Sequence, residues 1–577
     1  MLGKIFINYR PEDSIGTAGR LQDRIAQAFG QKNLFHGCRR VSISNCRNTL
    51  LLLCGCVLLC LLVQGDRVHF LDYATNSDIL LPVSYVWDIR NHNYAWSGFE
   101  LPRIPSLFPD LVTYAALDVL LGDFRWAMAA YALLQGTVFI VLAGCVISRL
   151  TGARAVDAAV VFLAVLTVVT VCNLPDARHF LLVELMYLPV CHFGSFIMSL
   201  VGALLALRLI EEWRASRAAL FTLCVTVADL SNRKFLIDFI VPLGVAGLVL
   251  IYLRLLSWRR TAGMVVCGIV GLLLARAADH LLVRQPNLPI DEIPMHMHLF
   301  FQEVPAYLAS MPPATLAIIF IPYVVFAAMF VVWLWRRWSS GITLAIAPCD
   351  TTVIFLWLFA AVAIVGCVAA LSAVYVWPEM FRYAEPAYFW PIIFVAAAAM
   401  PLLERWIAPL AIGQVAAVSI VIVAIGGWFG FVPLLMHWQH PLAGCLQVRR
   451  GELGLKAGLA SYWLSRPVTV STNWSIQIDQ VSDGGDPNYF GNDRFWYRTS
   501  FADPRRPPEY NFFVLTWLNP ERLQQRFGPP SRIANCGSDV LWIYDDPSAL
   551  YSKLNPSPQK MLDDLSIERG KEWAQFF

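Results

Sequence analysis

The chain has 577 residues, of which 57% are hydrophobic and only 15% are charged, and its mean hydropathy is +0.56. Soluble domains carry about 25% charged residues, so this chain cannot cover a water-facing surface of its size. Most of it must face lipid or other apolar helices. The net charge of +3 is too small to favour nucleic acid as a partner. The composition therefore predicts an integral membrane protein in a lipid bilayer.

Apolar runs of spanning length recur along the chain, with about eleven candidates. They cover residues 47–65, 126–148, 156–173, 190–210, 218–232, 235–256, 261–282, 313–335, 352–376, 387–403 and 408–430. We interpret the first run as an uncleaved anchor, because Gln64-Gly65-Asp66 offers no small-residue cleavage site. The sequence thus predicts an all-α, polytopic membrane domain over residues 46–436.

Arginines in the short loops predict the orientation of these spans. They gather in alternate loops, at Arg149 and Arg154, Arg214 and Arg217, Arg259 and Arg260, Arg336 and Arg337, and Arg405. Loops rich in Lys and Arg stay in the cytoplasm. The cytoplasmic side then holds residues 1–45, and an odd number of spans places residues 437–577 outside, together with the long loop 66–123.

Residues 437–577 change in character, because apolar runs shorten and Pro, Gly, Asp and Asn cluster between them. Strand-like runs at Val468–Val470, Asn511–Trp517 and Val540–Tyr544 predict a small α+β domain. Cys445 and Cys536 both lie in this region. A disulfide is permitted if the region is extracytoplasmic, but the sequence cannot supply the geometry, so the pairing is left open.

The N-terminal segment has a short strand at Ile5–Ile7, a polar turn and then an amphipathic helix with Leu21, Ile25 and Phe29 on one face. Residues 4–35 resemble the first strand and helix of bacterial TIR domains. The part of such a domain that would carry a catalytic glutamate is absent, and one strand and one helix cannot bury a core. We therefore interpret the segment as a truncated remnant, with a TIR-domain partner as the alternative.

The loop after the first span is rich in acidic residues. Its Asp78-Ile-Leu-Leu-Pro82 and Leu107-Phe-Pro-Asp-Leu111 elements, followed later by Pro189-Val-Cys-His192-Phe-Gly194, Arg382-Tyr383 and Gly458-Leu-Ala-Ser-Tyr-Trp463, resemble a bacterial group of membrane glycosyltransferases of the GT-C class. This resemblance covers about residues 47–550. It implies a multi-pass protein of the bacterial inner (cytoplasmic) membrane, with its C-terminal domain in the periplasm.

The resemblance also implies a donor and a set of site residues. A polyprenyl-phosphate sugar would present its head at the outer surface, where a carboxylate can act as general base or orient a divalent metal. We expect Asp78, and after it Asp72, in that role, and no resident metal is assigned. Arg382, Arg233 and Lys234 are expected to hold the phosphate, because cations offset its growing charge. The remaining substrate-side candidates are Tyr383 and His192.

Simpler roles compete for each of these residues. A loop aspartate such as Asp78 is often only solvated or capping a helix. Arg233 and Lys234 each have an aspartate four residues away, Asp229 and Asp238, so local ion pairs are an alternative. Arg382 can serve as an interfacial anchor, and His192 can hydrogen-bond a neighbouring helix.

Three functions remain open at the level of sequence. The first is a glycosyltransferase that moves a sugar from a polyprenyl-phosphate donor to a cell-envelope acceptor. The second is a transporter or flippase, although midplane charges are few and no half-to-half repeat is visible. The third is a non-enzymatic signalling protein linked through the TIR-like segment. The acidic loop favours the first.

Overall fold

The computed structural model describes most of the helical core and the C-terminal sheet. Its described residues are 6–7, 35–36, 43–63, 74–91, 99–102, 104–173, 182–190, 192–280, 282, 290–339, 348–376, 378–407, 438–503 and 505–554. Near the N-terminus, β1 (Phe6–Ile7) pairs in parallel with β2 (Phe35–His36). The strand expected at Ile5–Ile7 is thus present in part, whereas the helix expected around Leu21–Phe29 lies outside the described residues.

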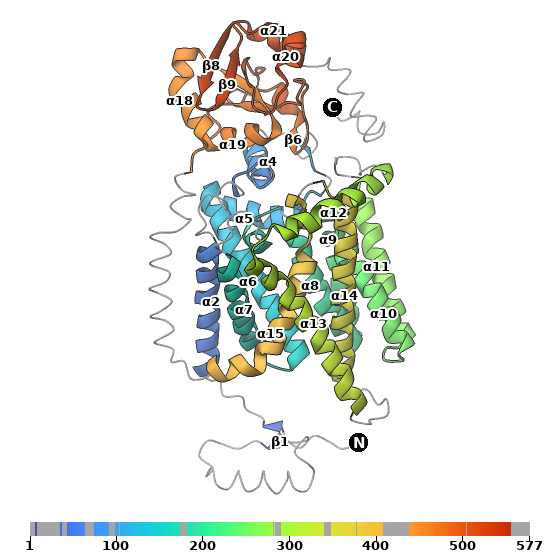
Figure 1. Ribbon diagram of the computed structural model, residues 1–577. Coiled ribbons are helices and arrows are strands. Elements are labelled where there is room, and N and C mark those ends of the chain that lie inside the picture. Colours follow the sequence, from blue (N-terminus) through green and yellow to red (C-terminus); the bar gives the residue numbers. More distant parts are fainter. Residues whose placement is uncertain are drawn as a thin grey trace.

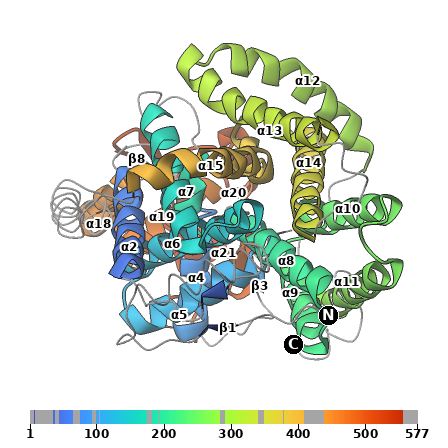
Figure 2. The ribbon, with the colours of Figure 1, turned by 90° about the horizontal axis from the view of Figure 1, so that it is seen from below.

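A bundle of long helices forms the body of the protein (Figure 1). Its members are α2 (Ile43–Val63), α6 (Phe124–Thr151), α7 (Ala155–Asn173), α8 (Phe193–Glu211), α9 (Ala215–Ser231), α10 (Val241–Tyr252), α11 (Trp258–Asp279), α13 (Pro313–Ser339), α14 (Pro348–Val374) and α15 (Glu385–Ile407). Apolar runs of this length form helices because a helix satisfies every backbone polar group within its own segment. Seen along the bundle, α2, α6 and α7 pack together, and α9 packs on α11 (Figure 2).

Helices occur at every expected span except 408–430, which lies outside the described residues. Within the described part of the chain, six helices are long and apolar enough to cross a membrane: α6, α7, α8, α11, α13 and α14. The protein is therefore mostly helical and has the composition of a multi-pass membrane protein. The total of eleven spans stays a prediction.

Helix ends follow ordinary local rules. The Asp123 side chain caps α6 by accepting hydrogen bonds from Arg125 N at 2.8 Å and Trp126 N at 3.3 Å. Gly152 ends the same helix at φ 77°, a left-handed conformation that glycine adopts without steric cost. These two residues set the length of the longest helix of the bundle.

The loop expected at 66–123 is largely structured. It contains α4 (Leu81–Asn91), β3 (Phe99–Glu100), the π-helical turn η2 (Leu107–Leu111) and α5 (Val112–Leu121). Figure 1 places α4 between the helix bundle and the C-terminal sheet. Shorter segments complete the bundle: η3 (Leu182–Tyr187), η4 (Leu236–Ile240), η5 (Ile290–Glu292), α12 (Ile293–Ala309) and η6 (Pro378–Tyr383).

The C-terminal part is built on a five-stranded mixed sheet in the order β5-β4-β7-β9-β8. Its strands are β4 (Ala457–Ala460), β5 (Ile478–Gln480), β7 (Tyr510–Val514), β8 (Arg532–Cys536) and β9 (Asp539–Ile543), and its helices are α18 (Pro441–Leu453), α19 (Tyr462–Ser471), α20 (Pro520–Phe527) and α21 (Pro547–Leu554). Strand β4 is parallel to β5 and β7, whereas β9 is antiparallel to β7 and β8.

Two of the three expected strands are confirmed, since β7 and β9 overlap the runs 511–517 and 540–544. The third expectation is wrong, because Val468–Val470 lies in α19. There Val468 and Val470 are both fully buried, so two β-branched residues fill the core from a helix that packs on β5. Cys445 and Cys536 form the disulfide that the sequence left open, with their Cα atoms 5.6 Å apart.

Candidate functional site

The carboxylate of Asp78 lies between a cation and a phenol from distant parts of the chain. Arg382 Nη1 donates to Asp78 Oδ2 at 3.0 Å, and the hydroxyl of Tyr462 donates to Asp78 Oδ1. The three residues come from the turn before α4, from η6 and from the first residue of α19. The side chains of Asp78 and Arg382 are 21% and 19% exposed, so both can be reached from outside the bundle.

Local hydrogen bonds fix the turn that presents Asp78. The side chain of Asn76 accepts from Ile79 N at 3.0 Å, and Asp78 O accepts from Leu81 N at 3.2 Å as α4 begins. Ser77 Oγ donates to Tyr462 O at 2.6 Å. The turn is therefore tied both to its own helix and to α19, which orients the carboxylate before any substrate arrives.

His192 and Tyr383 continue this cluster into the bundle. Their rings lie 4.3 Å apart between centroids, and Asn232 Nδ2 lies 3.3 Å from His192 Nδ1. His192 is buried, so it packs between α9 and η6 rather than facing open solvent. The sequence-based alternative, a hydrogen bond to a neighbouring helix, describes this contact well, and the substrate-binding role of His192 stays a prediction.

Asp110 is a buried carboxylate that the sequence interpretation did not assign. It is 2% exposed, and the hydroxyl of Tyr131 donates to its Oδ1. Burial raises the pKa of Asp110 to about 7, although hydrogen bonds from Tyr131 and Ser106 lower it. A Cβ atom at Gly194 would stand 2.6 Å from Asp110 Oδ1, so only glycine allows this close approach. This contact explains the glycine of the Pro189–Gly194 element.

Three residues with left-handed backbone meet beside Asp110. Ser106, Val190 and His192 have φ values of 48°, 71° and 66°. Ser106 Oγ donates to Val190 O at 3.5 Å, and Ser106 N donates to Ser231 O at 3.1 Å. Such conformations are costly for non-glycine residues, above all for β-branched valine, and they gather at functional sites. These strained residues lie near the Asp78–Arg382 ion pair, because the His192 ring contacts Tyr383, the neighbour of Arg382.

All five sequence elements that carry the resemblance therefore lie in one contact network. The turn at 78–82 touches 382–383 and 458–463, the segment 107–111 touches 189–194, and 189–194 touches 382–383. The structure thus brings Asp78, Arg382, Tyr383 and His192 together.

Lys234 lies deeper and is already paired. Its ammonium group donates to Asp238 at 2.9 and 2.6 Å and lies 3.1 Å from Glu385 Oε2. The Lys234 side chain is only 8% exposed, and those of both carboxylates are 0% exposed. The ion pair with Asp238 is the local alternative raised by the sequence, whereas Glu385 from α15 is an additional partner. Because both carboxylates hold the ammonium, the phosphate-binding role of Lys234 stays a prediction.

Arg233 points toward another helix. It forms an ion pair with Asp279 at the end of α11, and Arg276 of α11 lies 3.7 Å from Asp229. These pairs join α9 to α11 and leave the phosphate-binding role of Arg233 a prediction. The second carboxylate candidate, Asp72, lies outside the described residues. Within the described part of the chain, no group of three His, Cys, Asp or Glu residues is arranged to hold a metal ion.

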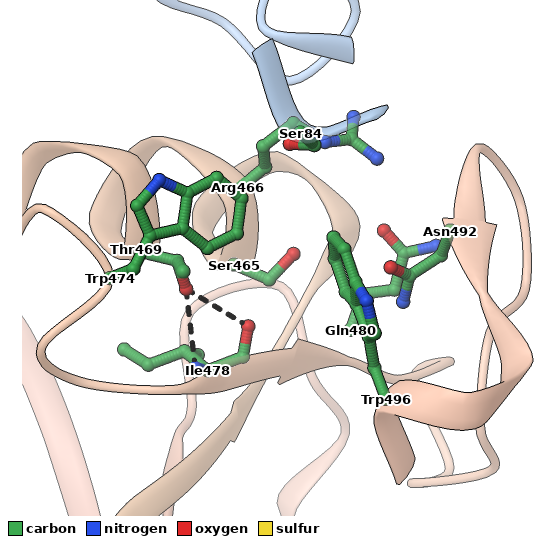
Figure 3. Close-up of a pocket in the computed structure, with 9 residues that line it drawn as sticks. All are labelled: Ser84, Ser465, Arg466, Thr469, Trp474, Ile478, Gln480, Asn492 and Trp496. Atoms are coloured by element: carbon green, nitrogen blue, oxygen red, sulfur yellow. Dashed lines mark hydrogen bonds between the residues drawn. The ribbon is translucent and has the colours of Figure 1, made fainter. Parts of the chain in front are cut away.

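The C-terminal part is fastened to the loop that carries Asp78. Arg466 is buried, and its guanidinium donates to Ser77 O and Gly491 O. Arg494 forms an ion pair with Glu100 at 2.7 Å, where β3 pairs with β6 (Asn492–Asp493). In Figure 3, Ser84 of α4 faces Arg466, Trp474 and Trp496 across a cavity of about 10 Å³, which has room for one water molecule.

Two buried carboxyl groups face each other across this interface. Asp88 of α4 is 2% exposed and Asp493 of β6 is 0% exposed. Trp496 Nε1 donates to Asp88 Oδ1 at 2.6 Å, and Asp493 Oδ1 accepts from Phe495 N at 2.7 Å. Burial raises the pKa of both, and the Asp88 charge raises the pKa of Asp493 further.

We expect Asp493→Asn to make the C-terminal part less sensitive to pH. A carboxyl whose pKa is raised by folding binds more protons when folded, so stability falls as pH rises above 3.8 toward the raised pKa. The variant removes that titration with little change in the shape of the side chain. Each pKa unit corresponds to about 1.4 kcal/mol. Calorimetric unfolding at pH 5 and pH 8 measures the slope, and an unchanged slope would show that the pair does not titrate in this range.

No family model matches the sequence, and no curated protein matches it. Among solved structures, the chain is similar to the oligosaccharyltransferase of Archaeoglobus fulgidus in complex with Zn and sulfate, with a TM-score of 0.36 and 10% identity over 82% of this chain and 71% of that chain.

A second similar protein is ArnT from Cupriavidus metallidurans. Its complex with undecaprenyl phosphate has a TM-score of 0.36 and 12% identity, over 85% of this chain and 98% of that chain. Its apo state has the same TM-score and identity, over 83% of this chain and 94% of that chain.

Proposed function

We propose that this protein is a membrane glycosyltransferase that moves a sugar from a polyprenyl-phosphate donor to a cell-envelope acceptor. The observation that supports it best is the contact of Asp78 with Arg382 and Tyr462. A partly exposed carboxylate and a guanidinium stand side by side at the end of an apolar bundle. A lipid-linked sugar phosphate keeps its tail in the bilayer and its head group at the membrane surface. In this proposal, the head group meets the two side chains at that end of the bundle.

Asp78 acts as the general base in this proposal. Its carboxylate takes the proton of an acceptor hydroxyl as that oxygen forms a bond to the anomeric carbon of the sugar. The bond from that carbon to the phosphate oxygen breaks, and the electron pair leaves with the polyprenyl phosphate. Tyr462 donates a hydrogen bond to Asp78 and so acts as a positioning residue.

Arg382 stabilises the leaving group. A guanidinium offers five N–H donors in a planar fork that matches phosphate, so it can meet Asp78 and the donor phosphate together. The charge that grows on the phosphate during bond cleavage is offset at that point. In this proposal, Arg382 therefore contacts both the general base Asp78 and the phosphate of the bound donor.

The product can be identified by deleting the gene and comparing envelope glycans and polyprenyl-linked sugars by mass spectrometry. We expect one glycan to disappear and its lipid-linked donor to accumulate, with wild-type protein restoring both. A deletion that changes no glycan and no lipid-linked sugar would overturn the proposal. Transport of a labelled substrate in proteoliposomes without covalent turnover would favour a transporter in its place.

Tyr462→Phe should reduce kcat while leaving the KM for the donor nearly unchanged. The change removes the hydroxyl that donates to Asp78 and keeps the ring that packs against Phe490, with centroids 5.0 Å apart. Hydrogen bonds to charged groups contribute about 1.5–3 kcal/mol, so we expect about a 10- to 100-fold loss. Tyr544→Phe, whose hydroxyl donates to Gly528 O, is the matched control. Equal kinetics in both variants would remove Tyr462 from the mechanism.

A further inference from the structure

A large groove opens on the C-terminal part, and Asp78 is not among the residues that line it. Its volume is about 770 Å³, within the range of about 300–1,000 Å³ that is typical of ligand sites. Three half-buried aromatic rings line it, those of Trp474, Phe501 and Tyr551. Three cations also line it: Arg450, Lys456 and Arg506. The groove is far larger than the cavity beside Ser84, and Trp474 lines both.

The aromatic rings are held in place by other rings. Trp474 stacks on Trp87 of α4 with centroids 3.8 Å apart and planes 5° apart, and it lies 5.6 Å from Phe501. Tyr551 of α21 is stacked on Tyr510 at 6.4 Å. Rings fixed in this way can offer a flat face to a ligand at little cost in conformational entropy. The C–H faces of sugar rings fit such surfaces.

The backbone that presents Trp474 is strained. Asn473 and Trp474 have φ values of 50° and 62°, a left-handed conformation that bulky residues rarely adopt. The turn directly follows Thr472, the C-cap of α19, and Trp474 N donates to Thr469 O at 3.0 Å there. Residues in such conformations persist where the surrounding structure holds them, and they cluster at active sites and ligand-binding sites.

The rim of the groove is preorganised. Gln477 is buried, and its side-chain amide donates to Trp496 O at 3.0 Å and to Thr499 O at 3.2 Å. Its carbonyl oxygen accepts from Phe501 N at 2.9 Å. The segment that carries Phe501 is thus fixed to the sheet. This wall of the groove therefore has its shape before a ligand binds.

Charge at the groove is positive overall. Lys456 pairs with Glu509, and Arg506 lies 3.4 Å from Asp503. Arg450 instead donates to two backbone carbonyls, Leu455 O at 3.4 Å and Ser475 O at 3.1 Å. Three cations against two carboxylates leave one positive charge, and the orientation of the Arg450 guanidinium is fixed by those carbonyls. An acidic ligand would be favoured at this position.

We propose that this groove binds a saccharide chain that carries acidic groups, and that this chain is the acceptor of the transfer reaction. The role of this chain as the acceptor rests on the proposed function, whereas the binding of an acidic saccharide does not. Helix α4 connects the two sites, since it begins just after Asp78 and carries Trp87, which stacks on Trp474. Nine residues of mostly helical chain span about 14 Å. One saccharide chain can reach both.

The test measures binding of two hexasaccharides to the full chain in nanodiscs by isothermal titration calorimetry. One is hexagalacturonate, which is acidic, and the other is maltohexaose, which is neutral. We expect the acidic hexamer to bind at least about tenfold more tightly, and Tyr551→Ala and Arg450→Ala each to weaken it about tenfold. Equal affinity for the two hexamers, or no binding of either, would overturn the assignment.

The control variant is Trp517→Ala, which removes an exposed tryptophan of the same part of the chain outside the groove lining. It should bind hexagalacturonate as wild type does, and a similar loss there would overturn the site. Asp78→Asn should also bind normally, because the groove does not include it. If Asp78→Asn keeps full glycan synthesis while the groove binds the acidic hexamer, the proposed reaction fails and the binding site stands.

Discussion

Asp78→Asn is expected to lower glycosyl transfer by about 10²- to 10⁴-fold, the range contributed by general acid–base catalysis. Asparagine has nearly the same shape and can still accept the hydrogen bond from Tyr462. It cannot take a proton from an acceptor hydroxyl, and it lacks the charge that holds Arg382. The fold should persist, because the Asp78 side chain is partly exposed and the surrounding turn is fixed by Asn76 and Ser77.

The measurement compares turnover of the lipid-linked donor named by the glycan profile, in membranes matched for protein abundance. Asp545→Asn is a suitable control, since it removes a carboxylate that is 71% exposed and 3.8 Å from its cation. That variant should keep wild-type turnover. Full activity in Asp78→Asn would show that this carboxylate is not the base and would leave Asp72 and Asp110 as the next carboxylates to test.

The helical part of the fold could be predicted from the sequence because its signal is local. An apolar run long enough to span a bilayer has few alternatives to a helix, so the expected spans coincide with helices wherever the structure describes them. Val468–Val470 was predicted wrongly for the converse reason. Three residues carry little local information, and the packing of α19 on β5 overrides the β preference of valine.

The candidate site could be predicted only in part, because its members are distant in sequence. The motifs named Asp78, Arg382, Tyr383 and His192 one by one, but only the fold brings Arg382 and Tyr462 to Asp78 across 304 and 384 residues.

Asp110 was missed because nothing local marks a buried carboxylate. A signal existed in the glycine at position 194, whose need for close approach becomes evident only beside its partner. The same limit applies to charge pairing. Lys234 and Asp238 are four residues apart in the chain, so their ion pair could be anticipated from helical spacing. Glu385 could not, because it reaches the same ammonium from α15. Helical spacing therefore predicted the partner of Lys234 four residues away but not the partner on α15.

Removing the disulfide by Cys445→Ser and Cys536→Ser is expected to destabilise the C-terminal part by about 2–5 kcal/mol. The two cysteines join α18 to the end of β8 over a separation of 91 residues. A cross-link over so long a loop removes much conformational freedom from the unfolded chain, in the entropic account of disulfide stability. Hydrogen exchange of the β7 and β9 amides in the full chain would measure the loss as faster exchange.

Cys172→Ser, which removes an exposed free cysteine of α7, is the matched control and should exchange like wild type. Wild-type protein treated with a reductant should behave like the double variant, and equal exchange before and after reduction would contradict the prediction. The outcome also bears on orientation. Disulfides persist in oxidising compartments, so a protein isolated with this bond intact would support the proposed placement of residues 437–577 outside the cytoplasm. There the groove would meet envelope saccharides rather than cytoplasmic ones.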